Sequence, residues 1–159
     1  MSDLTAKLAS TSKVEMTQLV MPPDATGLGI AFGGRVMEWT DLAASMAAMR
    51  HARMPVVTAC IDQLSFLAPI RVGQIVVLRA RVNAVFGSSM EVEVNVVAED
   101  PANGERRDCC EAFLTLVALG PSGTPAKAPI LLPQTEEEEQ RAREAVARRA
   151  ARMARRRKA

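Results

Sequence analysis

The sequence predicts an α+β domain in which one long helix packs on an antiparallel sheet. Residues 33–51 form an almost entirely apolar helical segment, and residues 56–119 contain four strand-like runs separated by short turns. Short connections join antiparallel neighbours, so these runs are expected to pair in one sheet of five to six strands. A sheet of this kind needs an apolar cover, which the helix supplies.

The composition indicates one globular domain with extensions. The chain has 159 residues and a formal net charge of +2, with four Phe, one Trp and no Tyr. The core must therefore consist mainly of Val, Leu, Ile, Met and Ala. Residues 1–133 carry 11 basic and 13 acidic side chains, whereas residues 134–159 carry nine basic and five acidic ones. The basic charge is concentrated in the tail.

The sequence favours a cytoplasmic protein without a metal site. No run approaches the roughly 20 apolar residues of a membrane span, and residues 1–13 lack the pattern of a signal peptide. Cys60, Cys109 and Cys110 provide no disulfide framework and no CxxC motif. With one histidine in the chain, a structural zinc site is not expected.

The first part of the chain leads into the long helix. Residues 1–12 are expected to be a flexible lead, and residues 13–21 a first strand that Pro22 and Pro23 end. Residues 25–30 are a loop, and the helix ends before Pro55, because the residue before a proline avoids the helical region.

Four further strands are predicted at residues 56–66, 74–86, 90–99 and 107–119. Apolar and polar residues alternate in the middle two, so one face of the sheet is apolar. The other face is expected to meet solvent or a polar interface in an oligomer, since it carries Arg79, Arg81, Glu91, Glu93 and Asn95.

Two extensions follow the domain, which spans residues 13–120. Residues 121–134 form a Pro-rich linker whose apolar patch at 129–133 is expected to dock on the domain. Residues 135–159 are expected to form a charged helix. Thr135 can cap its N-terminus, with Glu138 completing a capping box.

Asp41 is the first candidate for chemistry, because it lies about two turns inside an apolar helix. A buried carboxylate is costly unless it is hydrogen-bonded, so Asp41 has either a structural partner or a chemical role. Glu38 lies on nearly the same face and either tunes Asp41 or is a solvated or arginine-paired residue. His51 is interpreted as a surface residue at the helix end.

Several motifs resemble the hotdog-fold acyl-CoA thioesterases, in particular the cytosolic acyl-CoA hydrolase branch. They are Gly29-x-x-Phe32-Gly33-Gly34 followed by Asp41, the segment Val56-Val57-Thr58-Ala59-Cys60-Ile61-Asp62 with Phe66, Pro69 and Gly73, and Ser89-Met90-Glu91-Val92. The order and spacing of these motifs carry the resemblance, which spans residues 14–157. It implies a hotdog fold, in which the sheet wraps around the long helix.

The resemblance also implies site residues. Asp41 falls at the position of the acid that activates water or attacks the thioester, and backbone N–H groups near Gly33 and Gly34 polarise the carbonyl. The start of a helix independently suits a developing oxyanion, because its N–H groups are unsatisfied. Candidate substrate-binding residues are Phe32, Thr26, Ser88, Ser89 and Arg71, and candidate tuning residues are Glu38 and Asp62. Family members often carry Asn in the loop before Phe32, where this chain has Thr26, Leu28 and Ile30.

The function implied is hydrolysis of acyl-CoA to a free fatty acid and coenzyme A, with no cofactor beyond the CoA of the substrate. A homodimer is expected to complete the active site, within a trimer of dimers. One alternative is a hotdog protein that binds acyl-CoA without turnover. Another is binding of nucleic acid or an acidic surface by the basic tail. The absence of aromatic residues from the tail disfavours nucleic acid.

Overall fold

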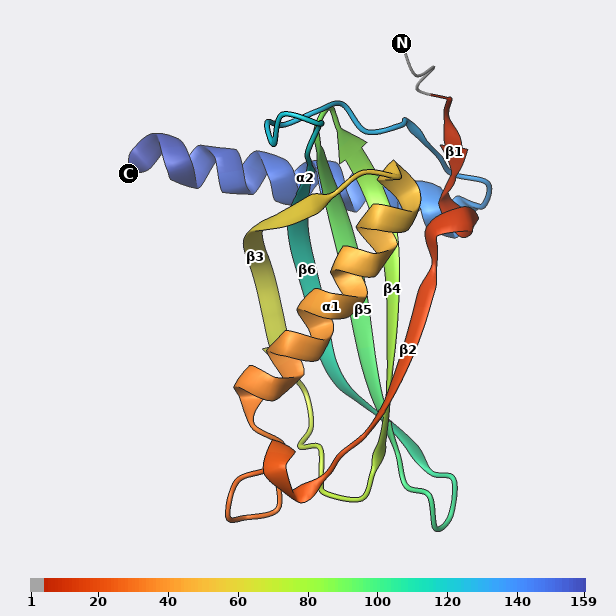
Figure 1. Cartoon of the computed structure of the whole chain (residues 1–159), viewed down its shortest axis with the longest axis vertical. Helices are drawn as coiled ribbons and strands as arrows, with labels where there is room; N and C mark the ends of the chain where they lie inside the picture. The colour runs from red at the N-terminus through yellow and green to blue at the C-terminus, as the bar shows by residue number, and fades with distance from the viewer. Residues whose placement is uncertain (1–4) are drawn as a thin grey trace.

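A computed structural model describes residues 5–159, and its main sheet has five antiparallel strands in the order β2-β4-β5-β6-β3. These strands are β2 (Val14–Leu19), β3 (Val56–Phe66), β4 (Ile75–Phe86), β5 (Ser89–Glu99) and β6 (Arg106–Ala118). The long helix α1 (Gly33–Ala52) runs along one face of this sheet (Figure 1). The predicted α+β class and the hotdog arrangement of helix and sheet are confirmed.

The core lies between α1 and the inner face of the sheet. The face of α1 toward the sheet is rich in alanine, and Ala43, Ala44, Ala47 and Ala48 are all fully buried. Their small side chains let the helix axis approach the strands closely, and the larger core residues come from the sheet, for example Leu78 and Leu114. The other face of α1 is left open.

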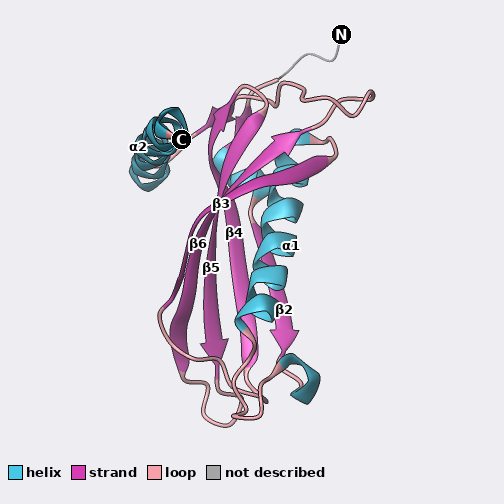
Figure 2. Ribbon diagram, turned by 90° about the vertical axis from the view of Figure 1, so that its left-hand side faces the viewer, coloured by secondary structure: helices cyan, strands magenta, loops and turns pink. Residues whose placement is uncertain are grey.

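The outer face of the sheet is covered by the second long helix, α2 (Glu136–Lys158), which crosses the strands at a steep angle (Figures 1 and 2). The prediction that Glu91 and Glu93 face solvent or an oligomer interface is therefore wrong, because these side chains are 2% and 7% exposed. Arginines of α2 neutralise both carboxylates within the same chain, which the alternation of the strand could not reveal.

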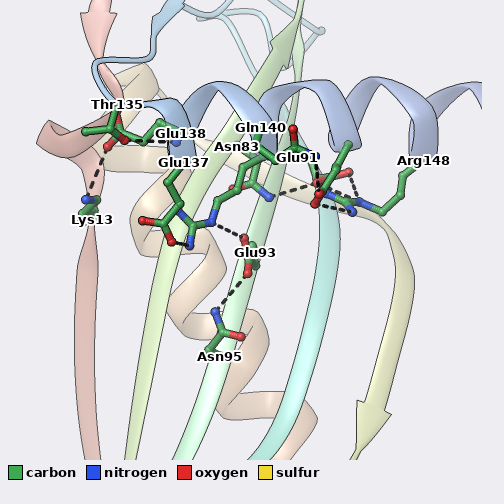
Figure 3. Close-up of polar contacts among 12 residues, drawn as sticks. Lys13, Asn83, Glu91, Glu93, Asn95, Thr135, Glu137, Glu138, Gln140 and Arg148 are labelled. Atoms are coloured by element: carbon green, nitrogen blue, oxygen red, sulfur yellow. Dashed lines mark hydrogen bonds and ion pairs between the residues drawn. The ribbon is translucent and has the colours of Figure 1, made fainter.

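Three ion pairs hold α2 on the sheet. Arg141 pairs with Glu93 at 3.4 Å, Arg148 with Glu91 at 2.7 Å, and Arg152 with Asp62 at 2.9 Å. Figure 3 shows Arg148 reaching from α2 to Glu91 on β5. Since Arg148 contacts both oxygens of Glu91, this pair has the bidentate geometry that gives strong and directional binding.

The N-terminus of α2 is capped as predicted, with one difference. The backbone N–H of Glu138 donates to the Thr135 hydroxyl at 3.1 Å. The Glu138 carboxylate accepts from the backbone of Gln134 at 2.8 Å rather than from that of Thr135. Both contacts satisfy polar groups at the start of the helix.

The lead and the linker pack together, which differs from the predicted flexible lead over residues 1–12. Within it, β1 (Lys7–Leu8) pairs in parallel with β7 (Leu131–Leu132) of the linker, and the 3-10 turn η1 (Ala9–Ser12) buries Ala9 and Ser12. Residues 1–4 of the predicted lead lie outside the described residues. The apolar patch of the linker supplies β7, so it docks on the domain as expected.

His51 is fully buried, so the prediction of a surface histidine is wrong. Its Nε2 donates to the carbonyl of Pro129 at 2.8 Å, and the Lys7 ammonium donates to the backbone carbonyl of His51 at 2.6 Å. The lead and linker thus cover the end of α1. Within residues 5–159, none of the helices combines the length and hydropathy needed to cross a membrane.

Candidate active site

Asp41 of α1 and Thr58 of β3 form the polar pair of the candidate site. The Thr58 hydroxyl donates to Oδ1 of Asp41 at 2.5 Å. Thr58 lies near the start of an edge strand, and Asp41 lies mid-helix on the side of α1 that the sheet does not cover. The hydrogen bond fixes the carboxylate and leaves Oδ2 available to a water or a substrate.

The surface around this pair is apolar and open. Met37, one turn before Asp41, and Leu42, next to it, are 39% and 49% exposed on α1, and Ile61 on β3 is 37% exposed. Asp41 itself is half-buried rather than enclosed. The sequence could not show this, because the apolar residues on both faces of α1 are equally compatible with complete burial.

The glycine turn leaves the start of α1 uncapped by any side chain. Phe32 is the N-cap residue, and its carbonyl accepts from the N–H groups of Arg35 and Val36. The first turn contains no acidic residue and has no side-chain cap. The N–H groups of Gly33 and Gly34 are therefore suited to receive a partial negative charge.

A cavity of about 380 Å³ opens at this end of α1. Its lining is apolar and comes from the glycine turn, the first turn of α1 and the segment after β3, including Ile30, Gly33, Val36, Phe66 and Ile70. A β-carbon added to Gly33 would lie 3.4 Å from the Phe66 ring. Glycine at this position keeps the backbone open to a ligand between the helix and the ring.

Asp41 and the N–H groups of the glycine turn do not meet within one chain. Gly34 lies seven residues before Asp41 in the same helix, which corresponds to about 10 Å of helix rise. A base and oxyanion donors that act on one carbonyl must each lie about 3 Å from the reacting atoms. One protomer therefore supplies both parts of a site but does not assemble them.

The two candidate tuning residues are occupied elsewhere. Glu38 is exposed and pairs with Arg35 at 2.8 Å, which is the structural alternative considered for it. Asp62 points to the outer face of the sheet, where it binds Arg152 and accepts a hydrogen bond from Thr115 at 2.6 Å. Its contacts attach α2 to the sheet.

The candidate substrate-binding residues fall at two ends of the sheet. Arg71 follows Ile70 of the cavity and forms a β-bridge with Ile30 of the glycine loop. The Thr26 hydroxyl accepts from the backbone of Leu28 in that loop, and Phe32 is half-exposed beside it. Ser88 and Ser89 connect β4 to β5, at the far end of β4 from this cavity.

The cysteines do not provide a nucleophile. All three are free, and burial raises the pKa of the Cys60, Cys109 and Cys110 thiols, the last to about 11. A raised pKa keeps the thiol protonated near neutral pH and so unreactive. Within residues 5–159, no group of three or more His, Cys, Asp or Glu side chains is arranged to hold a metal ion.

Sequence reasoning singled out Asp41 but missed Thr58 as a site residue. Thr58 appeared only as part of a longer motif. Thr58 could have been identified as a hydroxyl residue in the strand that directly follows the helix. Such a strand runs back alongside the helix, so its side chains can reach those of the helix. The bulges in β3, which decide the face that each side chain takes, leave no clear pattern in the sequence.

Comparison with known proteins identifies relatives that cover most of the chain. The family model of the thioesterase superfamily matches residues 28–105. The uncharacterized acyl-CoA thioester hydrolase YkhA of Bacillus subtilis is 43% identical over 127 residues, which cover 80% of this chain and 74% of that protein. The cytosolic acyl coenzyme A thioester hydrolase of Rattus norvegicus is 37% identical over 83% of this chain, which spans 35% of the rat protein.

Solved structures extend this similarity to the fold. A hexameric acyl-CoA thioesterase superposes with a TM-score of 0.91 at 40% identity, covering 95% of this chain and 97% of that one. An acyl-CoA hydrolase from Staphylococcus aureus, solved with butyryl-CoA and CoA, superposes with a TM-score of 0.89 at 36% identity, covering 95% and 92%. Alanine variants of the S. aureus enzyme at an asparagine, an aspartate and a threonine have also been solved.

Proposed function

This chain belongs to the thioesterase superfamily, among its acyl-CoA thioester hydrolases, and we propose that Asp41 is the carboxylate that carries out the hydrolysis. The reaction converts acyl-CoA and water to a free fatty acid and CoA. The coenzyme A is part of the substrate. The observation that carries the proposal is the hydrogen-bonded pair of Asp41 and Thr58 on an otherwise apolar surface.

The S. aureus variants support the assignment of this pair. The aspartate and threonine replaced there have the same separation along the chain, 17 residues, as Asp41 and Thr58 here. The asparagine replaced there precedes that aspartate by the same interval as Thr26 precedes Asp41. The loop of this chain therefore offers a hydroxyl where the S. aureus enzyme offers an amide.

In the proposed reaction Asp41 takes a proton from water, and the resulting hydroxide adds to the carbonyl carbon of the thioester. An equivalent first step is direct attack by Asp41, which gives an acyl-enzyme anhydride that water then opens. In both routes the N–H groups of Gly33 and Gly34 stabilise the oxyanion. In the first route the C–S bond then breaks, and the CoA thiolate takes up the proton held by Asp41. In the second route the C–S bond breaks as the anhydride forms, and the thiolate takes up a proton from the water that opens the anhydride.

A homodimer is proposed to complete the site. The separation between Asp41 and the glycine turn within one helix supports a site that takes the carboxylate from one subunit and the N–H groups from the other. The exposed apolar side chains around Asp41 provide the surface for such contact. Hexameric thioesterases among the solved relatives support a trimer of dimers as the larger assembly.

Phe32 and Arg71 are chain neighbours of residues that line the cavity at the start of α1, and the backbone N–H of Thr26 donates to the carbonyl of Ile30 in that lining. These three residues are proposed to contact the acyl-pantetheine part. Ser88 and Ser89 lie at the far end of β4, so a CoA contact there requires a neighbouring subunit. We propose a cytoplasmic location, as the name of the rat relative states for that protein.

One alternative has an observation in its favour. Thr26 in place of an amide is compatible with a protein that binds acyl-CoA without turnover. Binding of nucleic acid through the tail is disfavoured, because Arg141, Arg148 and Arg152 of α2 already pair with carboxylates of the sheet.

The test is hydrolysis of a panel of acyl-CoA substrates, from acetyl to palmitoyl, measured by release of the CoA thiol. We expect turnover by the natural chain and loss of turnover in Asp41→Ala, with an unchanged circular dichroism spectrum. Binding of acyl-CoA without thiol release by the natural chain would instead support the non-catalytic alternative.

A further inference from the structure

The sheet-facing arginines of α2 lie over successive strands of the sheet, toward its β3 edge. Arg141 and Arg148 meet Glu93 and Glu91 on β5, and Arg152 meets Asp62 on β3, the outermost strand. These arginines are seven and then four residues apart, so they share one face of the helix. Each one is matched by a carboxylate of the same chain.

The helix then continues beyond the sheet. Six residues follow Arg152 in α2, and Figure 1 shows this end projecting past β3. Six residues of helix extend about 9 Å, which is close to two strand spacings. Figure 2 shows α2 end-on beside the sheet, with its C-terminal end toward the viewer.

Arg155 and Arg156 continue the sheet-facing side of α2 toward this end, three and four residues after Arg152. Both are exposed, and neither has an ion pair among residues 5–159. Both side chains lie at the β3 edge of their own sheet, since Arg155 lines a groove with Asp62 and Gln63 and the Arg156 charge acts on the Cys60 thiol. The row of arginines therefore continues to this edge without a further carboxylate partner among the described residues. Arg157 lies on the opposite side of the helix and faces solvent.

The edge that the helix overshoots is itself unpaired. β3 is 11 residues long, pairs only with β6, and exposes Val57 and Ile61. A long apolar edge strand is a template for pairing with another chain. A second copy joined there would place its own β3 and β6 beneath the overhang.

The outer face also offers a place that such an overhang fits. A groove of about 560 Å³ runs beside α2, lined by Asp62, Gln63, Arg148, Ala151 and Arg155. Phe113 of β6 lies on this face, because the Arg148 guanidinium stacks 3.8 Å from its ring centroid. Glu111 lies two residues away on the same face, half-buried and without an ion pair among the described residues.

In a two-fold interface both copies use the same surface patch, so the projecting end of α2 and the surface that receives it must lie in one patch of each copy. The overhang, the groove and Glu111 meet this requirement. We infer that residues 153–158 of α2 dock on the outer sheet face of a second copy of this chain. This inference rests on the proposed dimer. Arg155 and Arg156 lie over the β3 and β6 strands of that copy and pair with its Glu111. Each subunit thus clamps the other from the side opposite the active site.

The first test compares two charge reversals in the full chain. Arg155→Glu with Arg156→Glu changes the facing pair, and Arg157→Glu with Lys158→Glu makes the same change of charge on the other sides of the helix. Dimer dissociation is measured by mass photometry across a dilution series. We expect the facing pair to raise the dissociation constant about tenfold and the control pair by less than about threefold. Equal effects of the two pairs, or no effect, would overturn the clamp.

The second test is rescue and cross-linking. Adding Glu111→Arg to the facing reversal should restore association, because the charges are exchanged and not lost. In a Cys60→Ser background, Arg156→Cys with Glu111→Cys should give a disulfide-linked dimer on a non-reducing gel, and Arg157→Cys with Glu111→Cys should not. Absence of both rescue and cross-link contradicts the clamp.

These outcomes are separable from those of the proposed function. Asp41→Asn should associate like the natural chain, because Asp41 is not part of the clamp. A natural chain that associates without hydrolysing acyl-CoA contradicts the proposed function and leaves the clamp intact. A natural chain that hydrolyses acyl-CoA as a monomer contradicts both the clamp and the dimeric site, and leaves the proposed hydrolysis by Asp41 intact.

Discussion

At the scale of single residues, two Thr–Asp hydrogen bonds on opposite faces of β3 have different consequences. Thr58 binds Asp41 at 2.5 Å on the open apolar side, and Thr115 of β6 binds Asp62 at 2.6 Å on the side that α2 covers. Asp62 is also neutralised by Arg152, whereas Asp41 has no cationic partner among the described residues. The first pair is thus available for chemistry, and the second holds elements together.

Thr58→Val removes the hydrogen bond to Asp41 and keeps the shape of the side chain. We expect kcat for acyl-CoA hydrolysis to fall about tenfold or more with little change in KM, because a freely rotating carboxylate is seldom oriented for attack. Thr115→Val breaks the matching bond to Asp62 and serves as the control. Equal kcat values for the two variants would show that Thr58 does not orient the reacting group.

His51 provides a prediction of pH dependence. Burial lowers the pKa of His51 and the nearby Lys7 charge lowers it further, while the hydrogen bond to Pro129 opposes them. Its Nδ1 is buried with no hydrogen-bond partner among the described residues, so protonation there is costly. The folded state therefore binds fewer protons than the unfolded state, and this contribution to stability is lost as pH falls below the unfolded value of 6.5.

We expect the free energy of unfolding to decrease by up to about 1.4 kcal/mol per pH unit just below pH 6.5 because of this group. His51→Gln keeps an N–H donor for Pro129 but does not titrate, so its stability should change less between pH 7.5 and 5.5. Urea titrations at both pH values measure the difference. The same pH dependence in both proteins would exclude His51 as its source.

At the scale of elements, α2 is attached mainly by charge. Ala145 is the one residue of the helix that is completely buried, and the ion pairs with the sheet come from Arg141, Arg148 and Arg152. Glu91 also accepts from Asn83, and the Arg148 guanidinium stacks on Phe113. A buried ion pair of this kind is costly to break from one side, since the remaining charge is left without a partner.

Arg148→Met is expected to destabilise the protein by about 3–5 kcal/mol, because Glu91 would remain buried and unpaired. Adding Glu91→Met to that variant should recover most of the loss. Glu144→Gln serves as a control, since Glu144 is half-exposed and lies 4.0 Å from Arg148. Urea unfolding at one protein concentration measures all four chains. If Arg148→Met unfolds at the urea concentration of the natural chain, the pair does not anchor α2.

The elements themselves were largely predictable from sequence, and their packing was not. Alternation and turn residues gave the strands, and Thr135 gave the start of α2. Polar residues on β5 were interpreted as exposed, because a pattern of apolar and polar residues cannot distinguish solvent from a buried arginine. The burial of His51 was missed for a similar reason, since its cover comes from residues 7 and 129, far away in the sequence.

At the scale of the whole molecule, the protomer leaves one apolar face uncovered. The open side of α1 and the free edge of β3 carry the exposed apolar residues around Asp41, and the glycine turn lies two helical turns away. A surface of this kind is typical of an interface. The sequence pointed to Asp41 and to the glycine turn separately, but their separation within one chain is visible only in the structure.

Met46→Lys is expected to weaken oligomer formation and hydrolysis together, because it places a charge on the exposed apolar face of α1. Val146→Lys makes a comparable change at an exposed apolar residue of α2 and is expected to affect neither. Size-exclusion chromatography with light scattering and the thiol-release assay measure the two properties. Full activity of a monomeric Met46→Lys chain would contradict a site completed by a second subunit.

The most direct measurement of the central claim is kcat/KM for acyl-CoA hydrolysis in two carboxylate-to-amide variants of α1. Asp41→Asn and Glu38→Gln each remove one negative charge from the same helix, three residues apart. The proposed role of Asp41 predicts a loss of at least about 100-fold in Asp41→Asn and less than about threefold in Glu38→Gln. Retention of activity in Asp41→Asn, with both variants folded, would contradict it.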